Sequence, residues 1–273
     1  MTERIPGPWS IPSDQYHAER TCESSSTLEC LRKSVQLYHG TYVTGAIRRP
    51  PPGPQQNLGI AVHALVLEPL RFPELVCLEP KVDRRTRDGK AHYAQFLEKA
   101  TGKTILSSED WERCRRMAQA IYDSRLARQL LEAPGPTEQA VRWETNDTGI
   151  RLKCRFDKLI DCGPIVDLKT AADPTPREWA MKVPGYGYHR QASLYQDGRA
   201  CALGGYTEFL HIVVGSTEPH DVVVYKMDSD YLLWGHEEMD GILSLLDQCR
   251  KTECWDSVWQ DEIQPLTPRW RRE

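Results

Sequence analysis

Two aspartates and a lysine are spaced along the chain in a way that suits hydrolytic chemistry. Polar and apolar residues alternate from Arg151 to Leu159, which predicts a half-buried strand. A turn follows, and Ile165–Lys169 predicts a second, short strand. If the two strands form a hairpin, Asp157 falls close to Asp167 across the ladder. Lys169 then projects from the same face as Asp167, because side chains two apart on a strand point the same way.

These residue types favour metal-assisted cleavage of a phosphodiester. Two neighbouring carboxylates repel each other unless a cation lies between them. Carboxylate oxygens with no nearby Cys or His pair favour Mg²⁺ or Mn²⁺ over zinc. A lysine beside such an ion can position or deprotonate a water, and it can offset charge on a phosphate. The spacing alone also fits an Asp-Lys pair on a solvated sheet face, because D-x-K is a frequent pattern.

A wider set of residues resembles the PD-(D/E)XK nuclease core. A K-x-R-x-D strand ending at Asp157, the run D-L-K-T from Asp167 and a helix with Q-x-x-x-Y from Gln191 occur in that order. The set is most similar to the RecE-type phage exonucleases (exodeoxyribonuclease VIII), relatives of lambda exonuclease and of the RecB nuclease domain. Asp-Leu-Lys replaces the commoner Glu-x-Lys. The similarity runs from TLECLRKSVQLYH through LGIAVHALVLEP to a tail with Trp255 and PRW.

The resemblance implies an α/β fold, with a mixed central sheet whose antiparallel active-site hairpin is flanked by helices. It implies that Asp157, Asp167 and the backbone carbonyl of Leu168 bind Mg²⁺, for which Mn²⁺ can substitute. Lys169 is then expected to orient or activate the attacking water. His63 lies in the setting G-x-x-x-H-x-L-x-L-E-P, where a histidine ligates the metal in these nucleases. A lone histidine on an apolar helix is otherwise a packed core-edge residue, and both roles stay open.

The same resemblance implies roles at the site for further residues. Gln191 and Tyr195 lie four apart on one helix face, where they are expected to contact DNA or to order the catalytic sheet. Glu138 lies where the family often carries another acidic residue, which either meets the metal or stays a solvated strand glutamate. A basic stretch after residue 80 is either a solvated loop or a source of phosphate contacts. Its candidate DNA-contacting residues are Arg84, Arg85 and Arg87.

The function implied by the resemblance is a Mg²⁺-dependent exonuclease. It is expected to digest linear double-stranded DNA from 5′ to 3′ and to leave 3′ single-stranded overhangs for recombination. The resemblance also implies a phage or prophage origin, the cytoplasm of a bacterial host, a RecT/Bet-like single-strand annealing partner and a homo-oligomeric ring on DNA ends. A Cas4-like or endonucleolytic nuclease of the same core is one alternative. A non-catalytic DNA-end binding module that loads a recombinase is another, although the intact Asp-Asp-Lys set argues against it.

Composition limits the remaining possibilities. The net charge of −4 provides no general attraction to nucleic acid, so any DNA contact must come from local basic patches. The nine cysteines are scattered without a C-x-x-C pair, which indicates reduced thiols and no iron–sulfur cluster. The first residues lack an apolar core, and no stretch reaches about 18 apolar residues. Neither a signal peptide nor a membrane span is therefore expected.

The chain is expected to form a single nuclease domain over residues 1–273, with an extended arm at 1–26 and a Trp-rich tail at 255–273. The proline run at 50–54 is expected to be a stiff connection within that domain. Helices are predicted at 27–38, 58–68, 91–100, 108–132, 177–182, 188–203 and 229–250. Strands are predicted at 75–78, 138–144, 151–159, 165–169, 208–215 and 221–226.

Overall fold

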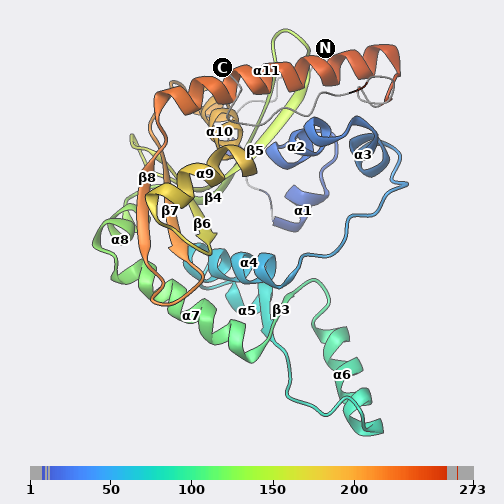
Figure 1. Ribbon diagram of the computed structural model, residues 1–273, viewed down its shortest axis with the longest axis vertical. Coiled ribbons are helices and arrows are strands. Elements are labelled where there is room, and N and C mark those ends of the chain that lie inside the picture. Colours follow the sequence, from blue (N-terminus) through green and yellow to red (C-terminus); the bar gives the residue numbers. More distant parts are fainter. Residues whose placement is uncertain (1–7, 10, 12, 257–262, 264–273) are drawn as a thin grey trace.

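A mixed six-stranded sheet lies at the centre of the fold (Figure 1). The computed structural model describes residues 8–9, 11, 13–256 and 263. The strand order is β1-β4-β5-β6-β7-β8, in which β6 and β7 are parallel and the other neighbours are antiparallel. The strands are β1 (Pro8–Trp9), β4 (Thr137–Glu144), β5 (Arg151–Leu159), β6 (Ile165–Ala171), β7 (Phe209–Gly215) and β8 (Val222–Lys226). This mixed α/β architecture confirms the predicted fold class.

Helices cover both faces of this sheet, and each face has its own buried apolar cluster (Figure 1). On one face lie α2 (Ser25–Lys33), α9 (Pro176–Tyr186), α10 (Tyr188–Leu203) and α11 (Ser229–Thr252). On the other lie α4 (Pro54–Leu67), α7 (Ser108–Asp123) and α8 (Arg125–Glu132). Strand β6 is covered on both sides: Ile165 packs in the first cluster, whereas Val166 and Leu168 pack in the second. The parallel connection from β6 to β7 runs through α9 and α10, which places α10 directly over the predicted hairpin.

A second, smaller unit of structure follows α4. The strands β2 (Val76–Leu78) and β3 (Thr104–Leu106) form a two-stranded parallel sheet after the short helix α5 (Phe72–Leu75). Between them, the chain extends away from the central sheet as an arm that carries α6 (Arg87–Lys99) (Figure 1). None of the α6 residues is buried. We call residues 79–103 the projecting arm.

The N-terminal region is more structured than the predicted extended arm. It contains β1, the helix α1 (Ser13–Ala18) and the start of α2 within residues 1–26. Helix α2 begins one turn earlier than predicted because Ser24, rather than Thr27, is its N-cap, and the two residues form a capping box. It is followed by α3 (Val35–Tyr38) and a π-helix, η1 (His39–Val43).

The helix predicted at 108–132 is interrupted at Ser124, and that prediction was wrong. The backbone of Ser124 is extended, and its hydroxyl accepts a hydrogen bond from the Ala127 N–H at 3.5 Å, as an N-cap of α8. A serine can end one helix and begin the next because its hydroxyl supplies the capping acceptor. Leu126, which follows this break on α8, is 53% exposed.

The C-terminal residues that the structure describes return to the N-terminal region. Trp255 stacks on His39 at 4.7 Å and on Tyr38 at 5.9 Å between ring centroids. The other tryptophans of the predicted Trp-rich tail, Trp259 and Trp270, lie outside the described residues. Among the described helices, none is long and apolar enough to cross a membrane.

The crossing of α10 and α11 gives a direct test of the fold. A Cβ added at Gly235 would lie 2.4 Å from the backbone oxygen of His189, whereas a Cβ at Gly241 of the same helix would meet nothing within 4 Å. Gly235→Ala should therefore destabilise the protein by about 1–3 kcal/mol through overpacking. Gly241→Ala should stabilise it by about 0.5–1 kcal/mol, because Gly costs entropy within a helix. Urea unfolding measures both values, and equal effects would contradict this helix crossing.

Candidate active site

The predicted hairpin opens at the position of the two aspartates. Backbone pairing between β5 and β6 joins Lys158 to Val166 and Leu159 to Ile165, and one further step in this register places Asp157 opposite Asp167. There the Oδ2 atom of Asp157 accepts the backbone N–H of Leu168 at 2.7 Å. A side chain thus takes the role that a backbone carbonyl has in a regular ladder, and the strands diverge beyond it.

Asp167 is enclosed by side chains from β6 and α10. Asp167 is 1% exposed and forms an ion pair with Lys169, whose side chain is 13% exposed. From α10, Gln191 donates Nε2–H to Asp167 Oδ1 at 3.4 Å and to the Tyr195 hydroxyl at 3.1 Å. The Gln191 and Tyr195 side chains therefore meet the carboxylate as an ordered pair, one helical turn apart.

Burial controls the protonation of both aspartates. It raises the pKa of Asp167 to about 6, although the Lys169 ammonium lowers it. It also raises the pKa of Asp157, against the lowering effect of Lys169. Burial lowers the pKa of Lys169, but Asp167 and Asp157 raise it more, and the net shift is upward. Lys169 therefore stays charged, while two ionised carboxylates are costly to bury without a further cation.

His63 reaches the same carboxylates from the opposite face. It lies on α4, and its Nδ1 is 3.4 Å from Asp157 Oδ2. Its side chain remains 29% exposed. Burial, followed by the Lys169 ammonium, lowers the pKa of His63 to about 4. The imidazole is therefore neutral at physiological pH, which is the form that binds metal.

Glu138 lies beside Asp157 on the neighbouring strand. Its backbone has a φ of 52°, a left-handed conformation that interrupts the regular β4 strand. Its Oε2 lies 2.7 Å from the Nε of Arg155, and its side chain is 14% exposed. Burial and then the Asp157 carboxylate raise the pKa of Glu138 to about 8. The side chain is enclosed rather than solvated, so the expected alternative of a solvated strand glutamate was wrong.

The three arginines of the basic stretch are not gathered at the hairpin. Arg84, Arg85 and Arg87 lie on the projecting arm, which extends away from the sheet (Figure 1). Arg84 is 3.3 Å from Glu79 and stacks over the Tyr93 ring at 4.3 Å. Arg85 and Arg87 are exposed. Any contact they make with nucleic acid is therefore separate from the aspartate site.

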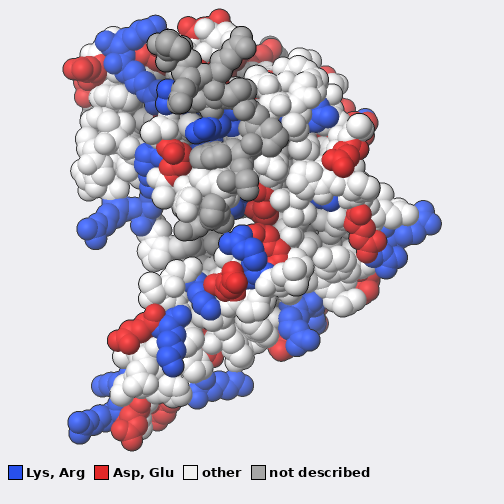
Figure 2. All heavy atoms as spheres, turned by 180° about the vertical axis from the view of Figure 1, so that it is seen from behind, with Lys and Arg blue, Asp and Glu red and all other residues white. Residues whose placement is uncertain are grey.

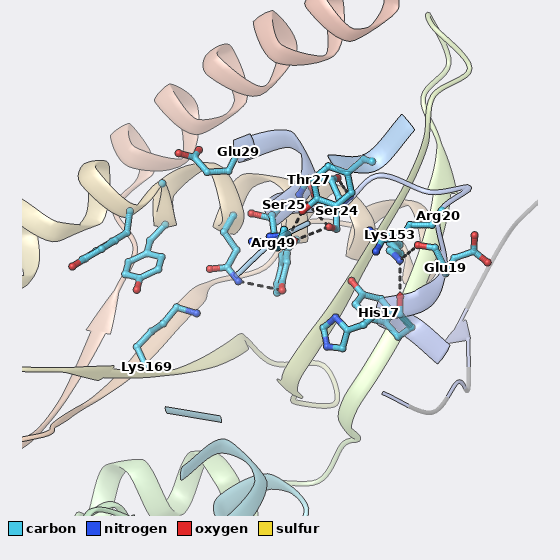
Figure 3. Close-up of a pocket in the computed structure, with 18 residues that line it drawn as sticks. His17, Glu19, Arg20, Ser24, Ser25, Thr27, Glu29, Arg49, Lys153 and Lys169 are labelled. Atoms are coloured by element: carbon cyan, nitrogen blue, oxygen red, sulfur yellow. Dashed lines mark hydrogen bonds between the residues drawn. The ribbon is translucent and has the colours of Figure 1, made fainter. Parts of the chain in front are cut away.

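A cavity of about 630 Å³ adjoins the aspartate site on the α10 face. Figure 3 shows Lys169 at one end of it, Arg20 and Lys153 at the other, and Arg49 between them. The Arg20 and Arg49 guanidiniums lie 5.2 and 5.9 Å from the Tyr42 ring centroid, and Arg49 Nη1 donates to the Tyr42 hydroxyl at 2.8 Å. Lys153 instead donates to the Tyr16 and Glu19 carbonyl oxygens, at 2.6 and 2.7 Å. The two arginines make one side of the cavity cationic, and Glu19 and Glu29 also line it.

Three residues near the aspartates were missed by sequence reasoning. Glu68 ends α4 and helps to raise the Glu138 pKa, and it stands within the same L-E-P run that singled out His63. Arg155 belongs to the alternating strand that carries Asp157. His211 is paired in register with Asp167 on β7 and is 1% exposed. A histidine inside the apolar strand F-L-H-I-V-V was the available signal for it.

The donor types around the hairpin fit a hard divalent cation. Asp157 and Asp167 offer carboxylate oxygens, the Leu168 carbonyl lies between Asp167 and Lys169 in sequence, and His63 offers a neutral imidazole. In the part of the chain that the structure describes, no three His, Cys, Asp or Glu side chains are already gathered around one point. The Lys169 ammonium instead neutralises Asp167. A bound cation would have to draw Asp167 away from Lys169.

The fold and the Asp-Asp-Lys hairpin together define the PD-(D/E)XK nuclease class. The chain belongs to the family described as a PDDEXK-like domain of unknown function (DUF3799), whose model matches residues 29–258. Membership in this family, together with the fold, supports a nuclease. PD-(D/E)XK nucleases generally use divalent metals, which agrees with the donor types at this site.

Comparison with a solved structure supports the same fold. A crystal structure described as a candidate exonuclease from Eubacterium rectale aligns with a TM-score of 0.67 at 14% identity, covering 95% of this chain and 97% of that one. A structure of SSO0001 aligns with a TM-score of 0.29 at 12% identity over 85% of this chain and 93% of that chain, a value too low to establish a shared fold. No curated protein matches the chain.

Asp167→Asn tests the electrostatic description in metal-free buffer. The pKa of Asp167 is raised from 3.8 to about 6, so the folded state binds its proton more tightly than the unfolded state does. Ionisation of Asp167 therefore lowers wild-type stability as pH rises through this window, and the neutral amide avoids that loss. At pH 8 with EDTA, the variant should be at least as stable as the wild type, and it should lose the stabilisation that Mg²⁺ gives.

Thermal unfolding with EDTA or Mg²⁺ measures both effects. Glu144→Gln is a suitable control, because Glu144 is an exposed strand acid on β4. A strong destabilisation of the Asp167→Asn variant at pH 8 would mean that the ion pair with Lys169 outweighs the cost of burying the carboxylate.

Proposed function

We propose that this protein is a Mg²⁺-dependent DNA exonuclease of the RecE type. The observation that carries the proposal is the opened hairpin, in which Asp157 and the Asp167–Lys169 pair stand together where β5 and β6 separate. The 5′-to-3′ polarity, the preference for linear duplex DNA and the role in recombination are supported by the resemblance described above. Mn²⁺ is expected to substitute for Mg²⁺.

Each residue of the site has a proposed role. Asp157, Asp167, the Leu168 carbonyl and His63 would hold the cation. Glu138, whose pKa is raised to about 8, would be favoured to ionise by a cation bound nearby. When bound, the cation supplies Lewis-acid stabilisation of charge on phosphate oxygens. With Asp167 engaged as a ligand, Lys169 would be available to the scissile phosphate. Its raised pKa favours orienting the water and offsetting charge over accepting a proton.

Gln191 and Tyr195 order the site rather than bind DNA in this proposal. Gln191 contacts both Asp167 and Tyr195, so the pair sets the orientation of one carboxylate oxygen. The cavity beside them, at about 630 Å³, is in the range of small-molecule sites. It therefore suits one or a few nucleotides of a separated strand, and its wall of Arg20 and Arg49 suits their phosphates.

The proposed partners rest on the resemblance. They are double-stranded DNA ends, a RecT/Bet-like single-strand annealing protein and further copies of this chain in a ring. A phage or prophage gene expressed in the bacterial cytoplasm belongs to the same proposal.

Digestion of end-labelled DNA tests the function. Linear duplex should release nucleotides with Mg²⁺ and none with EDTA, and covalently closed circular DNA should stay intact. A 5′ label should be released as mononucleotide early in the reaction, whereas a 3′ label should stay on long strands. Nicking of the circle would favour an endonuclease, and binding without any cleavage would favour a module that only recognises DNA ends.

Lys169 variants serve as controls in the same assay. Lys169→Ala should lose turnover by more than about 100-fold while it still binds DNA, because the ammonium acts mainly on the transition state. Lys169→Arg should not restore the rate, since the guanidinium is bulkier and always protonated. Lys226→Ala, at an exposed lysine of the same sheet, should behave as wild type. Full activity of the alanine variant would remove Lys169 from the mechanism.

The projecting arm is proposed to hold duplex phosphates. Between residues 79 and 103 it carries seven Lys or Arg and four Asp or Glu, in a chain whose net charge is −4. Figure 2 shows these side chains spread over the surface of the arm. Since α6 buries none of its residues, the exposed Arg85 and Arg87 are free to approach a phosphate backbone.

The salt dependence of DNA binding measures this contact. In EDTA, the Arg85→Ala/Arg87→Ala variant should bind duplex more weakly, and its slope of log K against log salt should fall by about 2, near 0.9 per lost contact. Arg125→Ala/Arg128→Ala removes two exposed arginines from α8 and is the matched control. Equal slopes for the two double variants would exclude the arm from DNA binding.

A further inference from the structure

His211 lies against the back of the catalytic carboxylate. It is paired in register with Asp167 across the parallel β6–β7 ladder, and its side chain projects from the same face of the sheet. Its Nε2 is 3.8 Å from Asp167 Oδ2. This is the oxygen that Lys169 also faces. His211 thus touches the Asp167–Lys169 pair on the side away from the opened hairpin.

Aromatic side chains hold the His211 ring in place, but none of the described residues forms a hydrogen bond with its Nε2. The rings of Trp179, Tyr188 and Phe209 pack edge-on against it, with centroids 5.3–5.7 Å away. His211 is 1% exposed, and its Nε2 is buried with no hydrogen-bond partner among the described residues. A buried polar atom left without a partner costs free energy, which a hydrogen bond formed in another state of the site would recover.

Two other buried histidines provide a comparison. His189 Nε2 is 3.0 Å from a Glu238 carboxylate oxygen, and His220 Nδ1 is 2.9 Å from the Gly215 carbonyl oxygen. Each of these rings is therefore anchored by at least one polar contact of normal length. His211 Nε2 instead points at an oxygen that lies just beyond hydrogen-bonding distance and that is already held by Lys169.

The His211 ring is suited to hold Asp167 beside a cation. It is buried among aromatic side chains, and such an apolar setting favours the neutral imidazole over the charged one. A neutral imidazole can donate one N–H to a carboxylate without adding a positive charge that would repel a cation. Lys169 cannot hold Asp167 in this way, because its ammonium competes with a cation for the same carboxylate.

We propose that His211 is a positioning residue for Asp167, which donates Nε2–H to Oδ2 when the carboxylate leaves Lys169 for a bound divalent cation. The inference rests on the proposed metal-dependent function. His211 makes no contact with substrate in this role. It fixes the orientation of a metal ligand from behind, as hydrogen-bonding partners of metal-binding carboxylates generally do.

Metal titration of two variants tests the role. His211→Phe keeps the ring but removes the donor, and His211→Gln places an amide N–H near the position of Nε2. Thermal shift against Mg²⁺ and against Mn²⁺ should show a midpoint at least about 10-fold higher for the Phe variant. The Gln variant should stay within about threefold of wild type. The Mg²⁺ concentration for half-maximal DNA cleavage should move in parallel.

A stability control separates positioning from packing. Leu246→Ala removes a fully buried side chain of α11 from the same apolar cluster, and it should lower the melting temperature without moving the metal midpoint. If the Phe variant shows no melting transition, His211→Met is read in the same way. Equal metal midpoints in wild type and the Phe variant, or equal losses in the Gln and Phe variants, would overturn the inference.

The thermal-shift and cleavage measurements distinguish failure of the His211 proposal from failure of the exonuclease proposal. A wild-type protein that gains stability from Mg²⁺ but cleaves no DNA would refute the exonuclease proposal while the His211 comparison still holds. A wild-type protein that cleaves DNA, with a Phe variant that binds metal normally, would refute only the role of His211.

Discussion

The carboxylate of Asp157 ends the β5–β6 ladder, and the geometry of the whole site depends on this one contact. Where a regular hairpin would continue, Asp157 Oδ2 accepts the Leu168 N–H and the two strands separate. A hydrogen bond to a charged group contributes about 1.5–3 kcal/mol, enough to replace a backbone bond. On its other edge β6 stays paired with β7 along its full length. Asp167 and Lys169 thus lie on a strand that is fully paired with β7 on one edge. On its other edge, β6 is unpaired with β5 beyond Val166.

This opening brings three acidic side chains together inside the protein. Glu138, Asp157 and Asp167 lie close together, and burial raises the pKa of each. Lys169 and Arg155 offset part of the charge, but each is tied to one carboxylate. The two apolar clusters on either face of the sheet supply the stability against which this arrangement persists. Buried acidic groups whose pKa values are raised together in this way are typical of functional sites.

The residues of the site that are placed by the alternation of side chains along a strand could be predicted from the sequence. The residues that are placed by tertiary contacts could not. The alternation along β5 and the D-L-K run predicted the hairpin and the relative placement of Asp157, Asp167 and Lys169. No sequence pattern indicated the left-handed backbone at Glu138, because that conformation is uncommon for a residue other than glycine. His211 escaped notice because a histidine in an apolar strand looks like core until its partner across the sheet is known.

Helix boundaries show the same division. The range of α10 agrees with the prediction because a clear turn precedes it and glycines follow it. The break at Ser124 was hidden, since serine is tolerated inside helices as well as at their ends. The contribution of His63 from α4 could be placed only through the resemblance, because nothing local ties that helix to a strand far along the chain.

The parallel pairing of β6 with β7 has a consequence for how the protein is made. Because α9 and α10 intervene, Asp167 remains on an exposed sheet edge until the ribosome has delivered the later strand. Pairings so distant in sequence raise contact order and form late in folding. A nascent chain therefore holds its aspartates without the helix and strand that orient them. An enzyme able to damage nucleic acid thus acquires its assembled catalytic centre only when most of its chain has been synthesised.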